Sequence, residues 1–295
     1  METTKKKITD SDYPALYQAA DSASLDAQAT YVRCIYSFLI LLVLAAIASL
    51  FSGDSHWFAI LSAAMFIVTL ILSFLLAAKR YDRTWYKGRA VAESVKTRAW
   101  RYMMRTKPYD EQDAISRSSF LSDLKQILDQ NRDLCQHLPE LQVNQEQITS
   151  IIDAIRCSSL EERMKIYENQ RIDDQRTWYA KKAGYNRRMS KRWFILMFVF
   201  QILAIGSVLV RIAYPGWDKL PTEVLAVAAA SVLSWMQVKR FQDLSTSYNF
   251  TAQEIGMIKG VLQGVCDEEK FSDFVSDAEN AFSREHTQWL ARRDV

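Results

Sequence analysis

The chain has 295 residues, room for about two domains. Its formal net charge of +3 is uninformative until it is mapped along the chain, and no nucleic-acid binding is expected. The mean hydropathy of −0.13 averages very apolar stretches with strongly polar ones, so it hides a membrane signal.

Four long apolar stretches contain no Asp, Glu, Lys or Arg: Ile35–Phe51, Trp57–Ala78, Trp193–Val210 and Val224–Val238. A bilayer core about 30 Å thick needs roughly 20 apolar residues as helix. The first three are long enough, and Pro221 extends the fourth to 221–238. Two buried hairpins in a soluble helical protein are the alternative, but soluble core helices rarely run that far without a charge. We therefore expect an all-α integral membrane protein with two transmembrane helical hairpins (four TM helices) and long cytoplasmic helical extensions.

Lys and Arg cluster where each hairpin enters and leaves the membrane, whereas the two connecting loops carry only Arg211 and Lys219. Basic residues concentrate on the cytoplasmic side. The bias predicts a multi-pass protein of the bacterial inner (cytoplasmic) membrane, with both termini and the middle segment in the cytoplasm.

The chain repeats one plan: a polar helix, a hairpin, and a second polar helix. This predicts a first unit over residues 1–109 (spans 35–51 and 57–78) and a helical connector over 110–158. A second unit follows over 159–295, with spans 193–210 and 221–238.

Local signals mark several helix ends. Ser159 and Glu162 have capping-box spacing, so a helix should start there and continue into the third span. Pro108 should end the helix that leaves the second span, and Trp57–Arg105 would be one continuous rod of roughly 70 Å. Helices are expected at Asp110–Asn131 and Gln147–Arg156, and no strands.

Charge is segregated along these helices. Residues 79–107 hold ten Lys/Arg and two acids, whereas residues 267–285 hold seven acids and two bases. Either the acidic stretch docks on the basic helix, within or between subunits, or the basic stretch contacts anionic lipid headgroups. The sequence leaves both open.

Catalysis is not expected. The chain lacks a phosphate-binding G-x-x-x-x-G-K-[ST] loop, a dinucleotide glycine pattern, H-E-x-x-H and G-x-S-x-G, and it has three scattered histidines. Cys135 and His137 resemble a metal-ligand fragment, but an ordinary surface pair is the favoured interpretation, so no metal and no cofactor are expected. The spans contain no ionisable residue of the kind that carriers use.

Small residues recur at four-residue spacing, which lets helices approach closely. They lie in the second span, in the fourth span and on the final helical segment: Ala59, Ala63; Ala226, Ala230, Ser234; Gly256, Gly260, Gly264. The span residues could pack within a hairpin or between subunits. The three glycines predict a close helix crossing.

Segments flanking the hairpins resemble the bacterial SLATT superfamily, two-span proteins associated with SMODS and SLOG domains. Trp85–Tyr102 looks like the exit helix of that family, and Ala20–Gln28 is similar to its entry phrase. In the second half, Glu162–Tyr167, Trp178–Ala183 and Phe274–Glu279 are similar to another branch. The chain resembles a tandem of two SLATT units, outside about 110–155.

The resemblance implies a membrane effector of bacterial conflict and anti-phage systems that assembles into pores when a nucleotide-sensing partner signals. The matching positions are expected to pack rather than bind a ligand: Arg89, Glu93, Trp100, Gln175, Trp178, Glu279 and Trp289.

The resulting hypothesis is an oligomeric pore in the lipid bilayer, a homo-oligomer that a separate nucleotide-sensing protein activates. Polar residues of the spans are the candidates to line the pore: Ser37, Ser49, Ser62, Thr69, Ser73, Gln201 and Gln237. The alternative is a non-conducting membrane scaffold or sensor that recruits a cytosolic partner.

Overall fold

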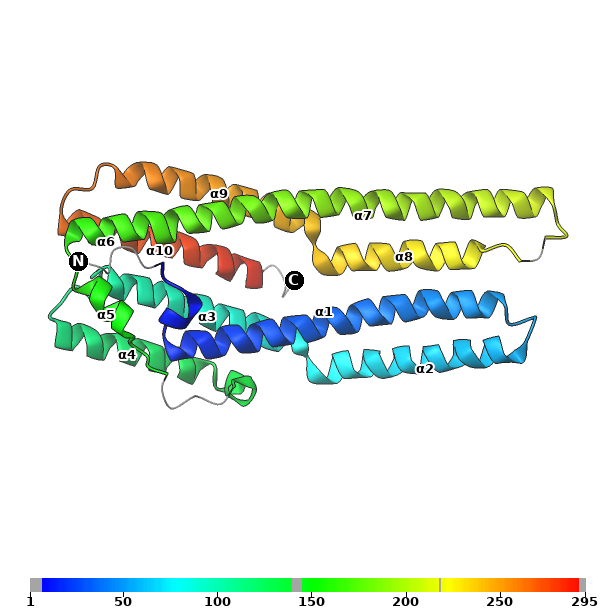
Figure 1. The fold of residues 1–295 in the computed structure, drawn as a ribbon, viewed down its shortest axis with the longest axis horizontal. Coiled ribbons are helices and arrows are strands. Elements are labelled where there is room, and N and C mark those ends of the chain that lie inside the picture. Colours follow the sequence, from blue (N-terminus) through cyan, green and yellow to red (C-terminus); the bar gives the residue numbers. More distant parts are fainter. Residues whose placement is uncertain (1–6, 140–144, 218, 292–295) are drawn as a thin grey trace. The chain divides into compact units, whose positions relative to one another are not determined.

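The structure is a computed structural model that describes residues 7–139, 145–217 and 219–291, with side chains described up to residue 283. Every regular element in these residues is helical, so the prediction of an all-α protein without strands is confirmed (Figure 1). The long helices are α1 (Ala15–Leu50), α2 (His56–Lys79), α3 (Tyr81–Met103), α4 (Asp113–Gln130), α7 (Asp173–Ala213), α8 (Thr222–Lys239), α9 (Phe241–Leu262) and α10 (Glu268–Ala291). The shorter helices are α5 (Ser150–Arg156) and α6 (Leu160–Tyr167).

The chain forms two compact units, each built from both halves of the sequence. The apolar unit comprises Ala29–Tyr81 and Lys181–Asn249. The polar unit comprises Met1–Gln28, Asp82–Ala180 and Phe250–Val295. These two units are defined by which helices pack together. The predicted boundaries at residues 109 and 158 are instead defined by the repeated order of helices along the sequence.

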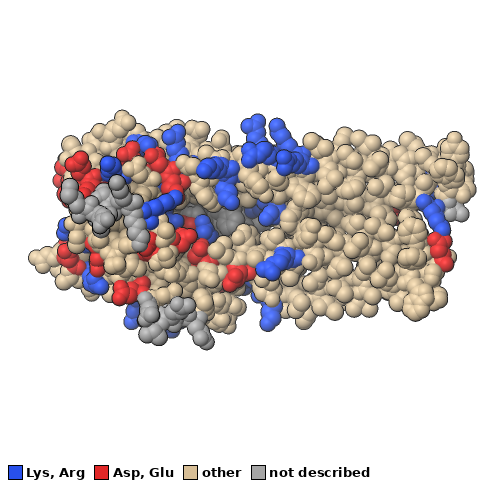
Figure 2. Space-filling model, viewed as in Figure 1, with Lys and Arg blue, Asp and Glu red and all other residues tan. Residues whose placement is uncertain are grey.

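The apolar unit contains all four predicted spans, which lie in α1, α2, α7 and α8. All four helices are long and apolar enough to cross a membrane, and only 6–28% of each apolar window is buried. Exposed apolar surface of this extent is stable against lipid rather than water. In the view of Figure 2 the surface of this unit shows basic and acidic side chains at the hairpin tips and further basic side chains at the opposite end.

Both hairpins end in the same backbone feature. Arg80 (φ 45°) follows α2 and Arg240 (φ 47°) follows α8, both in the left-handed region. A new helix starts at the next residue in each case, Tyr81 or Phe241. The predicted continuous rod over Trp57–Arg105 is therefore wrong, because a left-handed residue breaks the helical hydrogen-bond ladder.

The helix that enters the third span does start at the predicted capping box. The Ser159 hydroxyl accepts from the Glu162 amide, and the Glu162 carboxylate accepts from the Ser159 amide. Helical structure then continues to Ala213, interrupted by a π-helical segment, Glu168–Ile172. The i→i+5 bonds of such a segment accommodate one extra residue. As a result Tyr167 and Ile172, five residues apart, are both fully buried.

Candidate functional site in the spans and the buried ionic core

The first hairpin packs through small residues and one hydroxyl. Ala45 and Ala48 of α1 are buried, and the Ser62 hydroxyl of α2 donates to the Ala45 carbonyl at 3.0 Å. In the second hairpin Ser207 and Thr222 share a hydrogen bond of 2.7 Å between their hydroxyls, and Ala228 and Ala229 are buried. These hydroxyls are thus satisfied within their own hairpins, as an apolar environment requires.

The predicted pore residues divide into two groups. Ser62 and Thr69 are buried, and Thr69 donates within its own helix to the Phe66 carbonyl at 2.8 Å. The structure therefore corrects their assignment: within one chain they are packing residues that face no lumen. The others are exposed on the surface of the apolar unit: Ser37, Ser49, Ser73, Gln201 and Gln237.

The predicted small-residue positions also face outward. Ala59, Ala63, Ala226 and Ala230 are exposed and Ser234 is half-buried, so they do not pack the hairpins of a single chain. At Gly260 no heavy atom outside the local helix backbone comes within 4 Å of an added Cβ, and at Gly264 only the Val261 carbonyl does. At Gly256 an added Cβ would lie 3.4 Å from Arg176 Nε of α7, so this glycine does lie against another helix. The predicted crossing is absent at Gly260 and Gly264 within the described residues.

The close crossing that needs a glycine is at Gly88 of α3. A Cβ there would lie 2.9 Å from the Ala20 carbonyl oxygen and 3.0 Å from the Ser24 Cβ of α1. The Ser24 hydroxyl donates to the Trp85 carbonyl across the same contact at 2.9 Å. Gly88 lies inside the Trp85–Tyr102 phrase, but a single glycine without a spacing pattern gave no signal for its role.

A buried ion pair lies at the centre of the polar unit. Arg171 Nε and Nη2 donate to the two carboxylate oxygens of Glu279 at 2.8 and 2.7 Å, and both residues are almost fully buried. The Tyr167 hydroxyl donates to the same carboxylate at 3.0 Å. Burial lowers the pKa of Arg171, but the Glu279 carboxylate outweighs it and raises that pKa overall. The Arg171 guanidinium therefore stays charged at every physiological pH.

Aromatic rings of the first half of the chain enclose this pair. The Trp100 ring centroid lies 5.9 Å from the guanidinium carbon of Arg171 and 5.7 Å from the ring centroid of Tyr167. The Trp100 indole N–H donates to the Tyr13 hydroxyl at 2.9 Å. Trp100 and Glu279, both expected to be packing positions, thus meet in one core, whereas no role was predicted for Arg171.

The remaining family positions are more peripheral. Arg89 bridges the carboxylates of Asp21 (3.3 Å) and Glu93 (2.6 Å), which includes the expected i,i+4 pair. Burial lowers the pKa of Arg89, but these two carboxylates raise it overall. Gln175 is half-buried and Trp178 is exposed, so Trp178 does not anchor the core. The Trp289 side chain lies outside the described residues.

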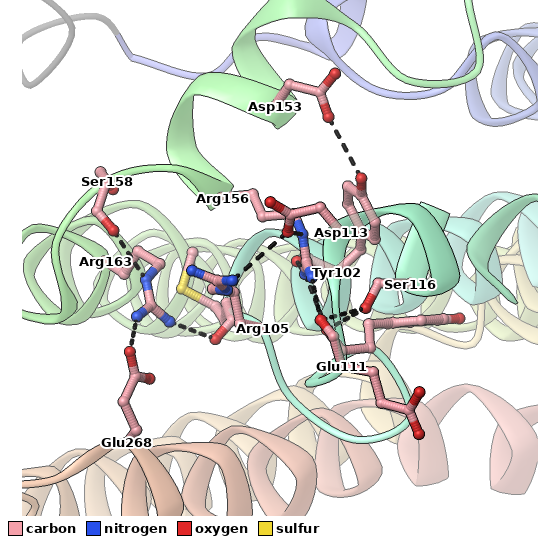
Figure 3. Close-up of polar contacts among 12 residues, drawn as sticks. Tyr102, Arg105, Glu111, Asp113, Ser116, Asp153, Arg156, Ser158, Arg163 and Glu268 are labelled. Carbon is pink, nitrogen blue, oxygen red and sulfur yellow. Dashed lines mark hydrogen bonds and ion pairs between the residues drawn. The ribbon is translucent and has the colours of Figure 1, made fainter. Parts of the chain in front are cut away.

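Two further buried arginines close the end of α3 (Figure 3). Arg156 donates through Nη1 to the carbonyls of Tyr102 (2.8 Å) and Tyr109 (2.9 Å). Arg163 donates through Nη1 to the Met104 carbonyl at 2.8 Å and pairs with Glu268 of α10. Cations at a helix C-terminus satisfy its free carbonyls and oppose its dipole. These arginines therefore tie α5, α6 and α10 to one helix end.

The acidic α10 docks on the basic α3 segment within the chain. Arg101 Nη2 donates to the Asn280 side-chain oxygen at 2.7 Å, and Lys107 Nζ lies 3.5 Å from Asp273 Oδ1. The docking interpretation of the charge segregation is thereby confirmed for one chain. The lipid interpretation of the basic stretch remains a prediction.

The described residues contain no group of three or more His, Cys, Asp or Glu side chains that could hold a metal. Cys135 is exposed, and the His137 ring contacts Gln136 at 3.4 Å.

Comparison with protein families gives two adjacent matches that cover most of the chain. Residues 14–164 match SMODS and SLOG-associating 2TM effector domain 3, and residues 167–289 match SMODS and SLOG-associating 2TM effector domain 1. The first match includes residues 110–155, which the family phrases quoted above did not cover. No curated protein and no solved structure matches the chain.

Proposed function

Because the chain belongs to the SLATT family of SMODS and SLOG-associating 2TM effector domains, as a tandem of two, we propose that it is an oligomeric membrane effector whose hairpins form a gated pore. The effector would act in bacterial conflict with phage, in the inner membrane, with both termini cytoplasmic. A separate nucleotide-sensing protein would supply the trigger by binding the open state more tightly than the closed one.

Gln201 is the observation that carries the proposal. Its carboxamide is exposed near the middle of a span that contains no charged residue, whereas Gln237 lies two residues before Lys239 at the basic end of the fourth span. An amide that meets hydrocarbon without a hydrogen-bond partner costs several kcal/mol, roughly 4–8 by transfer to an alkane. A second subunit or a water-filled lumen removes that cost. The outward-facing Ala226 and Ala230 provide a surface on which a neighbouring helix can approach closely.

Ion flux from liposomes that contain the purified full-length protein tests this function. We expect flux that requires the activator, and a loss of flux in Gln201→Leu and Gln237→Leu although the variants still insert. Gln130→Leu, an exposed glutamine of α4, is the matched control and should conduct normally. A well-folded protein that never conducts under any condition would contradict pore formation.

A non-conducting scaffold is the second candidate, because one groove of the polar unit is suited to a protein partner. It lies between α9 and α10, has a volume of about 670 Å³, and exposes Met257 (74%) and Val261 (63%) above Phe274. Glu254, Asp273 and Asp277 line the groove together with Lys270, so its rim carries more negative than positive charge. If flux is absent, recruitment of a cytosolic protein through this groove becomes the favoured function.

A further inference from the structure

The groove between α9 and α10 is bounded by two rows of side chains with the same spacing. Residues three and four positions apart lie on one side of an α-helix, and two such rows form holes into which the side chains of a third helix insert. An extended peptide would instead need an open sheet edge, and the described residues contain no strand. The rows are Glu254, Met257 and Val261 on α9, and Lys270, Phe274, Asp277 and Ala281 on α10.

The groove exposes apolar surface that a third helix would cover. Met257 and Val261 stand at its edge and are among the most exposed apolar side chains of the polar unit. Phe274 lies buried in the wall that α10 provides. Removal of exposed apolar surface from water favours association, and exposed apolar side chains grouped in a groove are typical of a contact surface. The apolar part of the groove therefore fits the apolar stripe of an amphipathic helix.

The charges that line the groove are mostly negative. Two of its acids, Glu254 and Asp277, form no ion pair with any described residue. The third acid, Asp273, lies 3.5 Å from Lys107. Lys270, the base of the lining, pairs at 3.3 Å with an acid outside it. Two carboxylates beside the apolar surface thus remain available to the cations of a partner.

We propose that this groove binds an amphipathic helix of a separate protein, a helix whose apolar stripe is flanked by Lys or Arg. The stripe packs on Met257 and Val261, and the flanking bases pair with Glu254 and Asp277. The same carboxylates repel an anionic membrane surface, and a second copy docked groove to groove would bring acid against acid. The inference rests on the proposed function in one respect, that a separate protein acts on this chain, and it does not require that the hairpins conduct.

A designed helical peptide of about four turns tests the groove, with Leu at the heptad positions and Lys on both flanks. Fluorescence anisotropy measures its binding to the full-length protein in phosphatidylcholine nanodiscs, and empty discs correct for its own affinity for lipid. We expect the Lys peptide to bind discs that contain the protein more tightly than empty discs, and added salt to weaken this binding. The same peptide with Glu in place of each Lys should not bind.

Substitutions in the protein separate the charged from the apolar contribution. Glu254→Gln combined with Asp277→Asn should weaken binding about fivefold, since exposed ion pairs contribute modestly. Met257→Gln should weaken binding about tenfold, because it removes an apolar side chain from the contact. Glu161→Gln and Ile115→Gln are the matched controls, since they change exposed side chains outside the groove and should leave binding unchanged.

Two results would overturn the inference: equal binding of the Lys and Glu peptides, or groove variants that bind the Lys peptide as tightly as the controls do. Neither result bears on the pore, because ion flux is measured separately. A protein that binds the Lys peptide but never conducts would support the groove and contradict the pore. Disulfide formation between two chains through Ala281→Cys, with all other cysteines removed, would show that copies of the chain occupy the groove, and the inference would be wrong.

Discussion

Three arginines that the sequence places among ordinary polar helices are buried in the polar unit: Arg156, Arg163 and Arg171. Each has backbone carbonyls or a carboxylate as partner, so its charge is compensated. Nothing in a single sequence separates them from solvated arginines, because their partners lie far away along the chain. Glu279 and Trp100 could be predicted as packing positions from the family phrases, whereas Arg171 required the fold.

Loss of Arg171 should destabilise the polar unit strongly. Arg171→Met leaves the Glu279 carboxylate buried without its cation, and such changes cost about 3–5 kcal/mol. Chemical unfolding of the solubilised protein measures the loss. Arg132→Met, which removes an exposed pair with Asp129, should change the unfolding free energy by less than about 1 kcal/mol. Equal effects of the two substitutions would show that the buried pair is not a major contributor.

Buried tyrosines should make the fold sensitive to alkali. Burial raises the pKa values of Tyr13, Tyr109 and Tyr167 above the ordinary value of 10.0. A group whose pKa is raised in the folded state contributes stability below its ordinary pKa, and that stability is lost as pH rises further. We therefore expect unfolding and tyrosine ionisation to coincide above pH 10, in a joint titration of ultraviolet absorbance and circular dichroism.

Tyr167→Phe should reduce the number of tyrosines that ionise in that transition, whereas Tyr185→Phe, at an exposed position, should not. Ionisation of all tyrosines while the helices remain intact would contradict the burial of these phenols.

At the scale of elements, apolar run length predicted the four spans, and the capping box predicted where helix α6 begins. The breaks after α2 and α8 could not be predicted, because left-handed positions are ordinarily read from Gly or Asn and here they are Arg80 and Arg240. The π-helical segment likewise has no composition signal. Docking of α10 on α3 remained one of two alternatives, since complementary charge does not specify whether the partner is protein or lipid.

Alanine substitutions at two glycines test how closely α1 and α3 pack. Gly88 lies at their contact, whereas Gly260 of α9 has open space around it. Gly88→Ala places a methyl group 2.9 Å from a backbone oxygen, and such overpacking costs about 1–3 kcal/mol. Gly260→Ala meets open space and should gain up to about 1 kcal/mol of helix propensity. Unfolding free energies of the two variants should therefore change in opposite directions. A neutral Gly88→Ala would show that the crossing is looser than described.

We also expect the exposed face of Gly260 to contact a neighbouring subunit of the proposed oligomer, because no described residue packs against it within the chain. Gly260→Leu should reduce the oligomer mass measured by cross-linking in membranes, because a large side chain separates crossing helices. An unchanged oligomer would exclude this face from assembly.

At the scale of the whole molecule, the predicted topology places the polar unit on one side of the membrane and the hairpin tips on the other. Cys135, Cys157 and Cys266 of the polar unit are exposed free thiols. Gly53, at the first hairpin tip, has open space for a cysteine side chain. An impermeant maleimide should label Gly53→Cys in spheroplasts but reach the three natural cysteines only after permeabilisation. Labelling of the natural cysteines in intact spheroplasts would reverse the topology.

The π-helical segment restricts how the sequence between the two repeats can vary in length. Deletion of one residue within Glu168–Ile172 would restore ordinary helix and leave the following residues nearly in phase with those before, because the π-helical segment accommodates one extra residue. A second deletion would instead rotate the following residues by about 100° and turn Asp173 away from Lys259, with which it pairs at 2.7 Å. Changes of length at this junction are therefore expected to be tolerated only where they keep the flanking helices in phase, so the fusion of the two halves depends on phase as well as on sequence.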